Sequence, residues 1–141
     1  MKRFLKISAV AAMVVAPEVG QAIGIGFGVR LGYRTAVAKV SDGVFEVVSL
    51  SGSAPVAYWC GAGDFAIRNL RTQATQRIYI WKAYGPSVSQ PGKKAVQFSL
   101  SPPEGVDTTP GYSVTVKRVG ENMTAGSAQG YCYDNMIDDF F

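Results

Sequence analysis

Residues 77–84, Arg-Ile-Tyr-Ile-Trp-Lys-Ala-Tyr, are the stretch that decides the fold. β-branched and aromatic side chains fill this run, and both of its faces are largely apolar, which is typical of a strand with neighbours on both sides. Gly85-Pro86 ends the run, because proline cannot donate to a continuing hydrogen-bond ladder. The sequence therefore predicts a central strand at residues 77–84.

Two runs downstream of this strand alternate between apolar and polar residues, which is the pattern of a half-buried strand. They cover residues 94–100 and residues 112–119. The inward side chains would be Val96, Phe98 and Leu100 in the first run and Tyr112, Val114 and Val116 in the second. The last stretch, residues 123–133, suits either a final strand or a short helix.

Upstream of the central strand, a tight turn joins two apolar runs, residues 36–40 and 44–50. The turn contains Asp42-Gly43. Because aspartate and glycine both tolerate positive φ, this dipeptide between apolar runs predicts a β-hairpin.

Residues 55–70 suit a helix, with Pro55 in its first turn. Apolar or small residues recur at helical spacing along one stripe: Val56, Trp59 or Cys60, Gly63, Ile67 and Leu70. Glycine costs about 1 kcal/mol in a helix, so we expect Gly61 and Gly63 to lie where the helix approaches a sheet closely. The predicted fold is α+β, a small antiparallel sheet of four to six strands with one helix packed on a face.

The chain contains two cysteines, Cys60 and Cys132. In an oxidising compartment an isolated pair is most simply one disulfide. Such a bond would tie the predicted helix to the C-terminal segment. A reactive free thiol is the alternative.

The first 22 residues have the layout of a secretory signal peptide. Three cations precede an uncharged apolar run at residues 7–16, and Gly20 and Ala22 are the small residues before a cut. The apolar run is shorter than the roughly twenty residues that cross a bilayer. We therefore expect a periplasmic or secreted protein, cleaved after Ala22.

Residues 23–35 form a glycine-rich lead-in, and residues 36–141 are long enough for a single domain. Glycines at positions 20, 24, 28 and 32 would also suit a packed membrane helix. The alternative is therefore a protein anchored in the inner membrane through residues 7–29, as a subunit of an envelope complex. Glu18 opposes this alternative, because a charge near the bilayer centre costs several kcal/mol unless it is paired.

Composition argues against a nucleic-acid partner. Residues 23–141 carry eleven cations and nine anions, and the cations are scattered along the chain. A nucleic-acid-binding protein usually concentrates its basic residues in a patch or stripe.

The absence of histidine excludes histidine-based triads and histidine metal sites. We predict no metal site and no cofactor. Asp64 has Arg68 at i+4, so we expect a surface ion pair between them. A hydrolase that uses Asp64 with a neighbouring polar group is the enzymatic alternative to a non-enzymatic domain.

Aromatic residues near the ends of the predicted elements form a candidate binding surface, together with the loop of residues 85–94. The residues of this surface are Tyr58, Trp59, Trp81, Tyr84 and Ser87. The alternative is that Trp59 and Trp81 simply pack the helix on the sheet. We expect a non-enzymatic interaction or structural accessory protein whose partner is another envelope protein.

A spaced pattern over about residues 44–133 resembles a group of short, exported, uncharacterised proteins of alphaproteobacteria. The pattern consists of Tyr58-Trp-Cys-Gly-Ala-Gly-Asp-Phe-Ala66, Arg77-Ile-Tyr-Ile80, Gly85-Pro-Ser87, Ala95-Val-Gln-Phe98 and Gly130-Tyr-Cys132. The resemblance implies export and a pairing of Cys60 with Cys132. It implies no activity.

Overall fold

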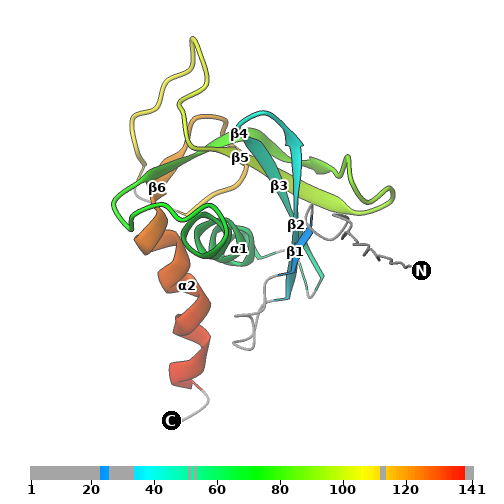
Figure 1. The fold of residues 1–141 in the computed structure, drawn as a ribbon, viewed down its shortest axis with the longest axis vertical. Coiled ribbons are helices and arrows are strands. Elements are labelled where there is room, and N and C mark those ends of the chain that lie inside the picture. The colour runs from blue at the N-terminus through cyan, green and yellow to red at the C-terminus, as the bar shows by residue number, and fades with distance from the viewer. Residues whose placement is uncertain (1–22, 26–33, 51, 53, 112–113, 139–141) are drawn as a thin grey trace, which may run out of the picture.

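The computed structural model describes residues 23–25, 34–50, 52, 54–111 and 114–138. Within these residues the chain forms a six-stranded antiparallel sheet and two helices (Figure 1). The strands are β1 (Ile23–Ile25), β2 (Thr35–Ser41), β3 (Val44–Ser49), β4 (Arg77–Pro86), β5 (Lys94–Ser99) and β6 (Asn122–Thr124), and the helices are α1 (Pro55–Arg68) and α2 (Ala125–Asp138). The predicted α+β fold is confirmed.

The strand order is β1-β2-β3-β5-β4-β6. β5 lies between β3 and β4 and is antiparallel to both, so β3 and β4 run parallel to each other. Parallel strands need a crossover, and α1 provides it. The predicted central strand thus has a neighbour on each side, β5 and β6. In the glycine-rich stretch, β1 is an edge strand paired with β2, and residues 26–33 lie outside the described part of the chain.

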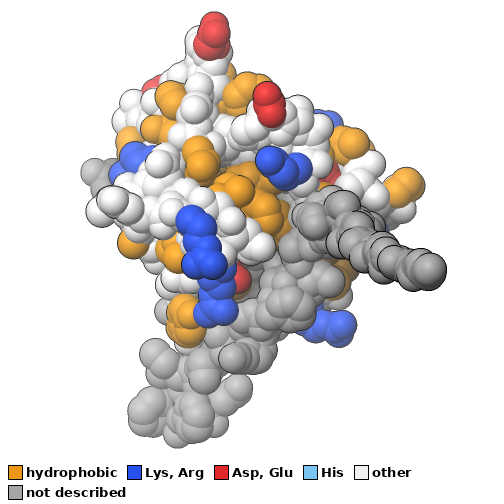
Figure 2. Space-filling view, viewed as in Figure 1, with side chains coloured by type: hydrophobic (Ala, Val, Ile, Leu, Met, Phe, Trp, Pro, Cys, Tyr) orange, Lys and Arg blue, Asp and Glu red, His pale blue; other side chains and the backbone are white. Residues whose placement is uncertain are grey.

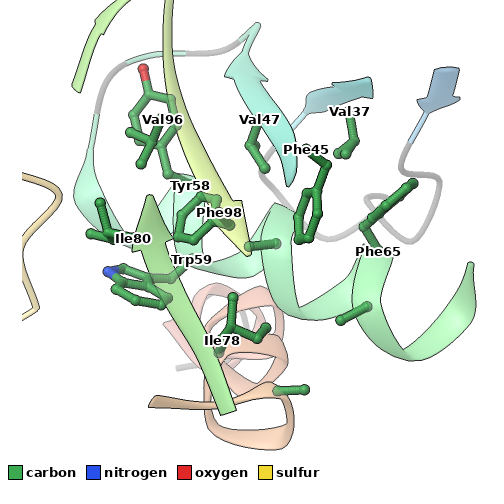
Figure 3. Close-up of a cluster of buried hydrophobic side chains, with 14 of the residues drawn as sticks. Val37, Phe45, Val47, Tyr58, Trp59, Phe65, Ile78, Ile80, Val96 and Phe98 are labelled. Carbon is green, nitrogen blue, oxygen red and sulfur yellow. The ribbon is translucent and has the colours of Figure 1, made fainter. Parts of the chain in front are cut away.

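α1 packs against one face of the sheet, and the core lies between them (Figure 3). Strands β3, β4 and β5 supply alternate side chains to this core, as their period-two patterns predict. Its largest members are Trp59, Tyr58, Phe45, Phe65 and Phe98, followed by Ile78 and Ile80. The predicted inward side chains Val96 and Phe98 are fully buried, and Leu100 packs against the cluster.

α1 begins at Pro55 as predicted and ends at Arg68, two residues before the predicted end. Arg71 adopts a left-handed backbone, with φ of 60°. The N–H of Thr72 then donates to the carbonyl of Ala66 at 3.0 Å. A left-handed residue just past a helix is a common way to satisfy its last carbonyl groups, and here arginine takes the place usually held by glycine.

The two glycines in α1 face different neighbours. A Cβ on Gly61 would lie 2.7 Å from Cγ1 of Val47 and 2.9 Å from Oγ1 of Thr35, so Gly61 faces the sheet as predicted. A Cβ on Gly63 would lie 2.8 Å from the carbonyl oxygen of Ala125, in α2. Gly63 therefore allows a close helix–helix contact that the sequence did not predict.

The predicted strand at residues 112–119 is wrong for the described residues 114–119, which have no strand structure. Val116 is nevertheless buried, and Val114 packs against the core. The segment runs beside β4, where the N–H of Tyr84 donates to the carbonyl of Val116 at 2.8 Å. A turn that ends at Gly120, with φ of 94°, separates it from β6, and β6 takes the edge position instead.

Residues 123–133 contain both structures that the sequence left open. Met123 and Thr124 belong to β6, and α2 starts directly afterwards at Ala125. Thr124 caps the start of this helix, since its hydroxyl oxygen accepts from the N–H of Ser127 at 3.1 Å.

Candidate functional site

The long β4–β5 hairpin reaches beyond the other strands at the right of Figure 1. We call residues 87–93, which connect its strands, the hairpin tip. The pairing of β4 with β5 shifts register twice, between Ile80 and Lys82 and between Lys82 and Gly85. Such irregularities bend a strand and increase its twist, which lets the tip turn back toward β3.

Glu46 on β3 holds the hairpin tip. It lies in the middle of the sheet, opposite Gln97 of β5, and has no exposed surface. The backbone N–H groups of Val88 and Ser89 donate to its two carboxylate oxygens at 3.0 and 2.8 Å. The hydroxyl of Ser87 donates at 2.6 Å, and the hydroxyl of Ser89 also donates to this carboxylate. One side chain therefore fixes three consecutive residues of the tip.

Burial raises the pKa of Glu46, and the hydrogen bonds from Ser87, Ser89 and Val88 outweigh this effect, so the pKa lies below its ordinary value of 4.5. The hydroxyl of Ser87 donates to the carboxylate of Glu46, as a serine nucleophile donates to its general base in some enzymes. A base with a lowered pKa accepts a proton poorly at neutral pH. The arrangement therefore suits a structural role better than a catalytic one. We call the hydrogen bonds between Glu46 and residues 87–89 the Glu46 clasp.

The tip and the end of β4 expose large apolar side chains. Val88 is 62% exposed, Trp81 42% and Tyr84 37%. Ser87 is half-buried, and its hydroxyl donates to Glu46. Trp81, Tyr84 and Ser87 of the predicted surface therefore lie in one hairpin, which also contains Val88.

Two residues of the predicted surface, Tyr58 and Trp59, are buried in the core, with 1% and 0% exposure. The ring of Tyr58 nevertheless contacts the ring of Tyr84. The indole N–H of Trp59 donates to the carbonyl of Thr115 at 3.1 Å, so its polar end is satisfied internally. Trp59 packs α1 on the sheet, which is the alternative that the sequence left open for it. Trp81 does not share that role, because it is exposed.

The prediction of Asp64 as a surface acid is wrong, because Asp64 is buried between the two helices, with 8% exposure. It does pair with Arg68, at 3.0 Å, and it also accepts a hydrogen bond from the amide of Gln129 in α2 at 3.1 Å. The sequence does not place α2, so it does not predict the contact between Asp64 and the side-chain amide of Gln129. The contacts of Asp64 join α1 to α2 and give no support to a hydrolase.

Cys60 and Cys132 form the predicted disulfide. Their Cα atoms lie 4.9 Å apart although 72 residues separate them in sequence. The bond joins α1 to α2, the C-terminal element, beside the contact made by Gly63. Neither cysteine is free, so a thiol site is excluded.

A second buried glutamate, Glu121, holds the long loop between β5 and β6. Its carboxylate accepts from the N–H of Gly111 at 2.8 Å and pairs with Arg118 at 2.9 Å. Burial raises the pKa of Glu121, and these contacts lower it below its ordinary value. Both buried glutamates therefore fix a loop to the sheet, but the loop held by Glu121 presents no large exposed apolar side chain among the described residues.

Sequence patterns did not identify Glu46 or Val88 as site residues. A glutamate in the middle of the apolar run Val-Phe-Glu-Val-Val is a signal that was available, since a buried strand rarely contains an unpartnered charge. Its partners, more than 40 residues away, could not be deduced.

Three further observations bear on function. No group of three histidine, cysteine, aspartate or glutamate residues close enough to hold a metal ion occurs in the described part of the chain. None of the helices formed by described residues is long and apolar enough to cross a bilayer. On the face in Figure 2, Lys and Arg side chains form one short vertical run left of centre and otherwise lie at separate places.

Comparison of this chain with family models, with curated proteins and with solved structures found no match.

Proposed function

We propose that this protein is an exported, non-enzymatic interaction domain that binds another envelope protein through its β4–β5 hairpin. The clasp made by Glu46 carries the proposal. A fully buried carboxylate is used to fix the hairpin tip, and that tip presents Val88, with 62% exposure, to solvent.

A fixed hairpin tip lowers the entropy cost of binding a partner. A mobile loop loses conformational freedom when it binds, and this loss weakens the complex. A loop that is already fixed avoids most of that loss, so its exposed side chains contribute more to affinity. Tryptophan and tyrosine are enriched among the residues that dominate protein interfaces, and Trp81 and Tyr84 stand on the same hairpin.

The hairpin is tested with Val88→Ser in protein recovered from the periplasm with an affinity tag. The serine removes the exposed apolar group and leaves the backbone N–H that donates to Glu46. We expect a stoichiometric partner to co-purify with the wild type and to fall at least tenfold with Val88→Ser.

Tyr133→Ser is the matched control, because Tyr133 is also an exposed apolar residue but lies on α2. It should retain the partner. Equal recovery with Val88→Ser and with the wild type would overturn the proposed role of the hairpin.

Export rests on the charged start, the short apolar run and the small residues before Ala22, and a disulfide is compatible with an oxidising compartment. We expect periplasmic protein whose intact mass matches a chain that begins at Ile23. Recovery of the full-length chain in the membrane fraction after carbonate extraction at high pH would favour the anchored alternative instead.

A further inference from the structure

A pocket of about 310 Å³ opens at the base of the β4–β5 hairpin. The end of β3 meets the start of β5 there, because Val48 pairs with Ala95 and the chains continue to Leu50 and Lys94. Tyr84 and Tyr58 close the pocket from β4 and from α1. Their rings are in edge-to-face contact, with centroids 5.8 Å apart.

The hydroxyl of Tyr58 is the notable group in this pocket. Tyr58 as a whole residue is 1% exposed, and its hydroxyl makes no hydrogen bond to any residue that the structure describes. Figure 3 shows this hydroxyl pointing away from Trp59 and Phe98. Among the described residues, Oγ1 of Thr72 is the one fully buried side-chain polar atom without a partner, so the Tyr58 hydroxyl reaches the open space of the pocket. It is therefore a donor available to a ligand atom there.

The charge at this pocket is positive. Lys93 and Lys94 line it, both are exposed, and neither forms an ion pair with a described residue. Burial raises the pKa of Tyr58, and the neighbouring Tyr84 raises it further, so the phenol stays protonated and remains a donor at neutral pH. A proton donor and two cations fit an anionic acceptor.

The wall beside the charged groups narrows the class of anion. Lysine pairs with phosphate and with carboxylate as a point charge, so Lys93 and Lys94 alone do not choose between these anions. Leu50, with 42% exposure, and the ring of Tyr84 supply an apolar wall beside the charged groups. An acidic side chain next to an apolar residue would satisfy both parts.

We propose that this pocket binds the carboxylate of an acidic residue, flanked by apolar residues, in a segment of the partner protein. The phenol of Tyr58 donates to the carboxylate, Lys93 and Lys94 provide the opposite charge, and Leu50 and Tyr84 contact the apolar neighbour. The inference rests on the proposed interaction function, because it names the chemistry of the partner at the base of the same hairpin.

The probe is the peptide acetyl-Leu-Glu-Leu-amide, titrated into ¹⁵N-labelled protein at constant ionic strength. We expect saturable shifts of the amides of residues 49–50, 84 and 93–94. The matched peptide acetyl-Leu-Gln-Leu-amide should bind at least tenfold more weakly. Equal affinity for the two peptides would overturn the proposal, and so would inorganic phosphate that bound the same amides more tightly than the glutamate peptide.

Three variants locate the binding. Tyr58→Phe keeps the packed ring and removes only the hydroxyl, so it should fold normally and weaken the glutamate peptide about tenfold. The double variant Lys93→Gln/Lys94→Gln should abolish detectable binding. Lys117→Gln, an exposed lysine outside the hairpin, should leave it unchanged.

The pocket and the hairpin can fail separately. Normal peptide binding by Tyr58→Phe and by the double lysine variant would refute the pocket, whatever Val88→Ser does to co-purification. Specific binding of the glutamate peptide, combined with full partner recovery by Val88→Ser, would retain the pocket and refute the role of the tip.

Discussion

Glu46 shows how much a single residue decides in this chain. An ionised carboxylate is seldom buried without partners, because removing it from water is costly. Glu46 is buried with four donors from Ser87, Val88 and Ser89. If the hairpin tip moved away, the carboxylate of Glu46 would either become exposed to water or remain buried without hydrogen-bond donors.

Glu46→Gln is expected to lower the free energy of unfolding by about 1–3 kcal/mol, because an amide nitrogen cannot accept the donors that face it. Urea unfolding at pH 7 measures the change. Glu104→Gln is the matched control, since Glu104 is exposed, and it should change stability by less than about 0.5 kcal/mol. A similar small change in both variants would show that the clasp does not stabilise the fold.

The pH dependence of stability follows from the same residue. The folded-state pKa values of Glu46 and Glu121 lie below the ordinary value of 4.5. Both carboxylates therefore stabilise the fold fully above about pH 4.5, and this stabilisation is lost as the pH falls through the folded-state values. The stability difference between the wild type and Glu46→Gln should be largest at neutral pH and should narrow toward pH 3. A difference that widened on acidification would contradict this sign.

At the scale of elements, α1 is the organising unit because it contacts the sheet on one side and α2 on the other. The sequence predicted its start, its stripe of apolar residues and the close approach of Gly61. It did not predict the contact with α2, since a run with Gly126 and Gly130 and mixed polar residues gives a weak helical signal. The disulfide and Gly63 indicate, in retrospect, where a second helix had to lie.

Gly63 and Gly130 offer a matched pair of helix substitutions. Alanine at Gly63 would overlap the backbone of α2, at Ala125 and Gln129, and backbone atoms cannot turn aside as a flexible side chain can. Gly63→Ala should therefore destabilise the fold by about 1–3 kcal/mol despite its better helix propensity. Gly130→Ala meets no atom within 4 Å and should stabilise by up to about 1 kcal/mol. Thermal unfolding compares them, and equal effects would argue against the close helix contact.

The segment at residues 112–119 shows a limit of periodicity. Alternation there correctly indicated that Val114 and Val116 face inward. Alternation cannot show whether neighbouring backbone groups form a continuous ladder, and here few of them do. The edge of β4 is instead completed by β6, whose three residues are too short to give a periodic signal.

At the scale of the molecule, three sets of contacts outside the core hold separate parts of the chain, and two of them join residues more than 40 positions apart. Glu46 fixes the hairpin tip, Glu121 fixes the loop before β6, and the disulfide joins α1 to α2. Composition and cysteine count predicted the last of these. The first two depended on tertiary contacts of single acids, which sequence patterns do not encode, and the pocket at the hairpin base depended on the same long-range packing.

The disulfide makes the stability of the fold depend on the redox state of the compartment in which the protein resides. Closing a loop of this length should stabilise the fold by roughly 4–5 kcal/mol through the entropy of the unfolded chain, and removal of a native disulfide typically costs 2–5 kcal/mol. We therefore expect Cys60→Ala/Cys132→Ala to lower the free energy of unfolding by about 2–5 kcal/mol in urea titration, with peptide binding at the hairpin base unchanged, because Tyr58 and the two lysines remain.

The same bond tests export at whole-molecule scale. Protein purified from the periplasm should resist alkylation in the absence of reductant, because both thiols are consumed. A chain expressed without residues 1–22 stays in a compartment where thiols are kept reduced. It should be alkylated at both Cys60 and Cys132 and should unfold at lower urea concentration, by the same margin as the double alanine variant. Resistance to alkylation in both preparations would show that the bond forms without export, and the disulfide would then no longer support an envelope location.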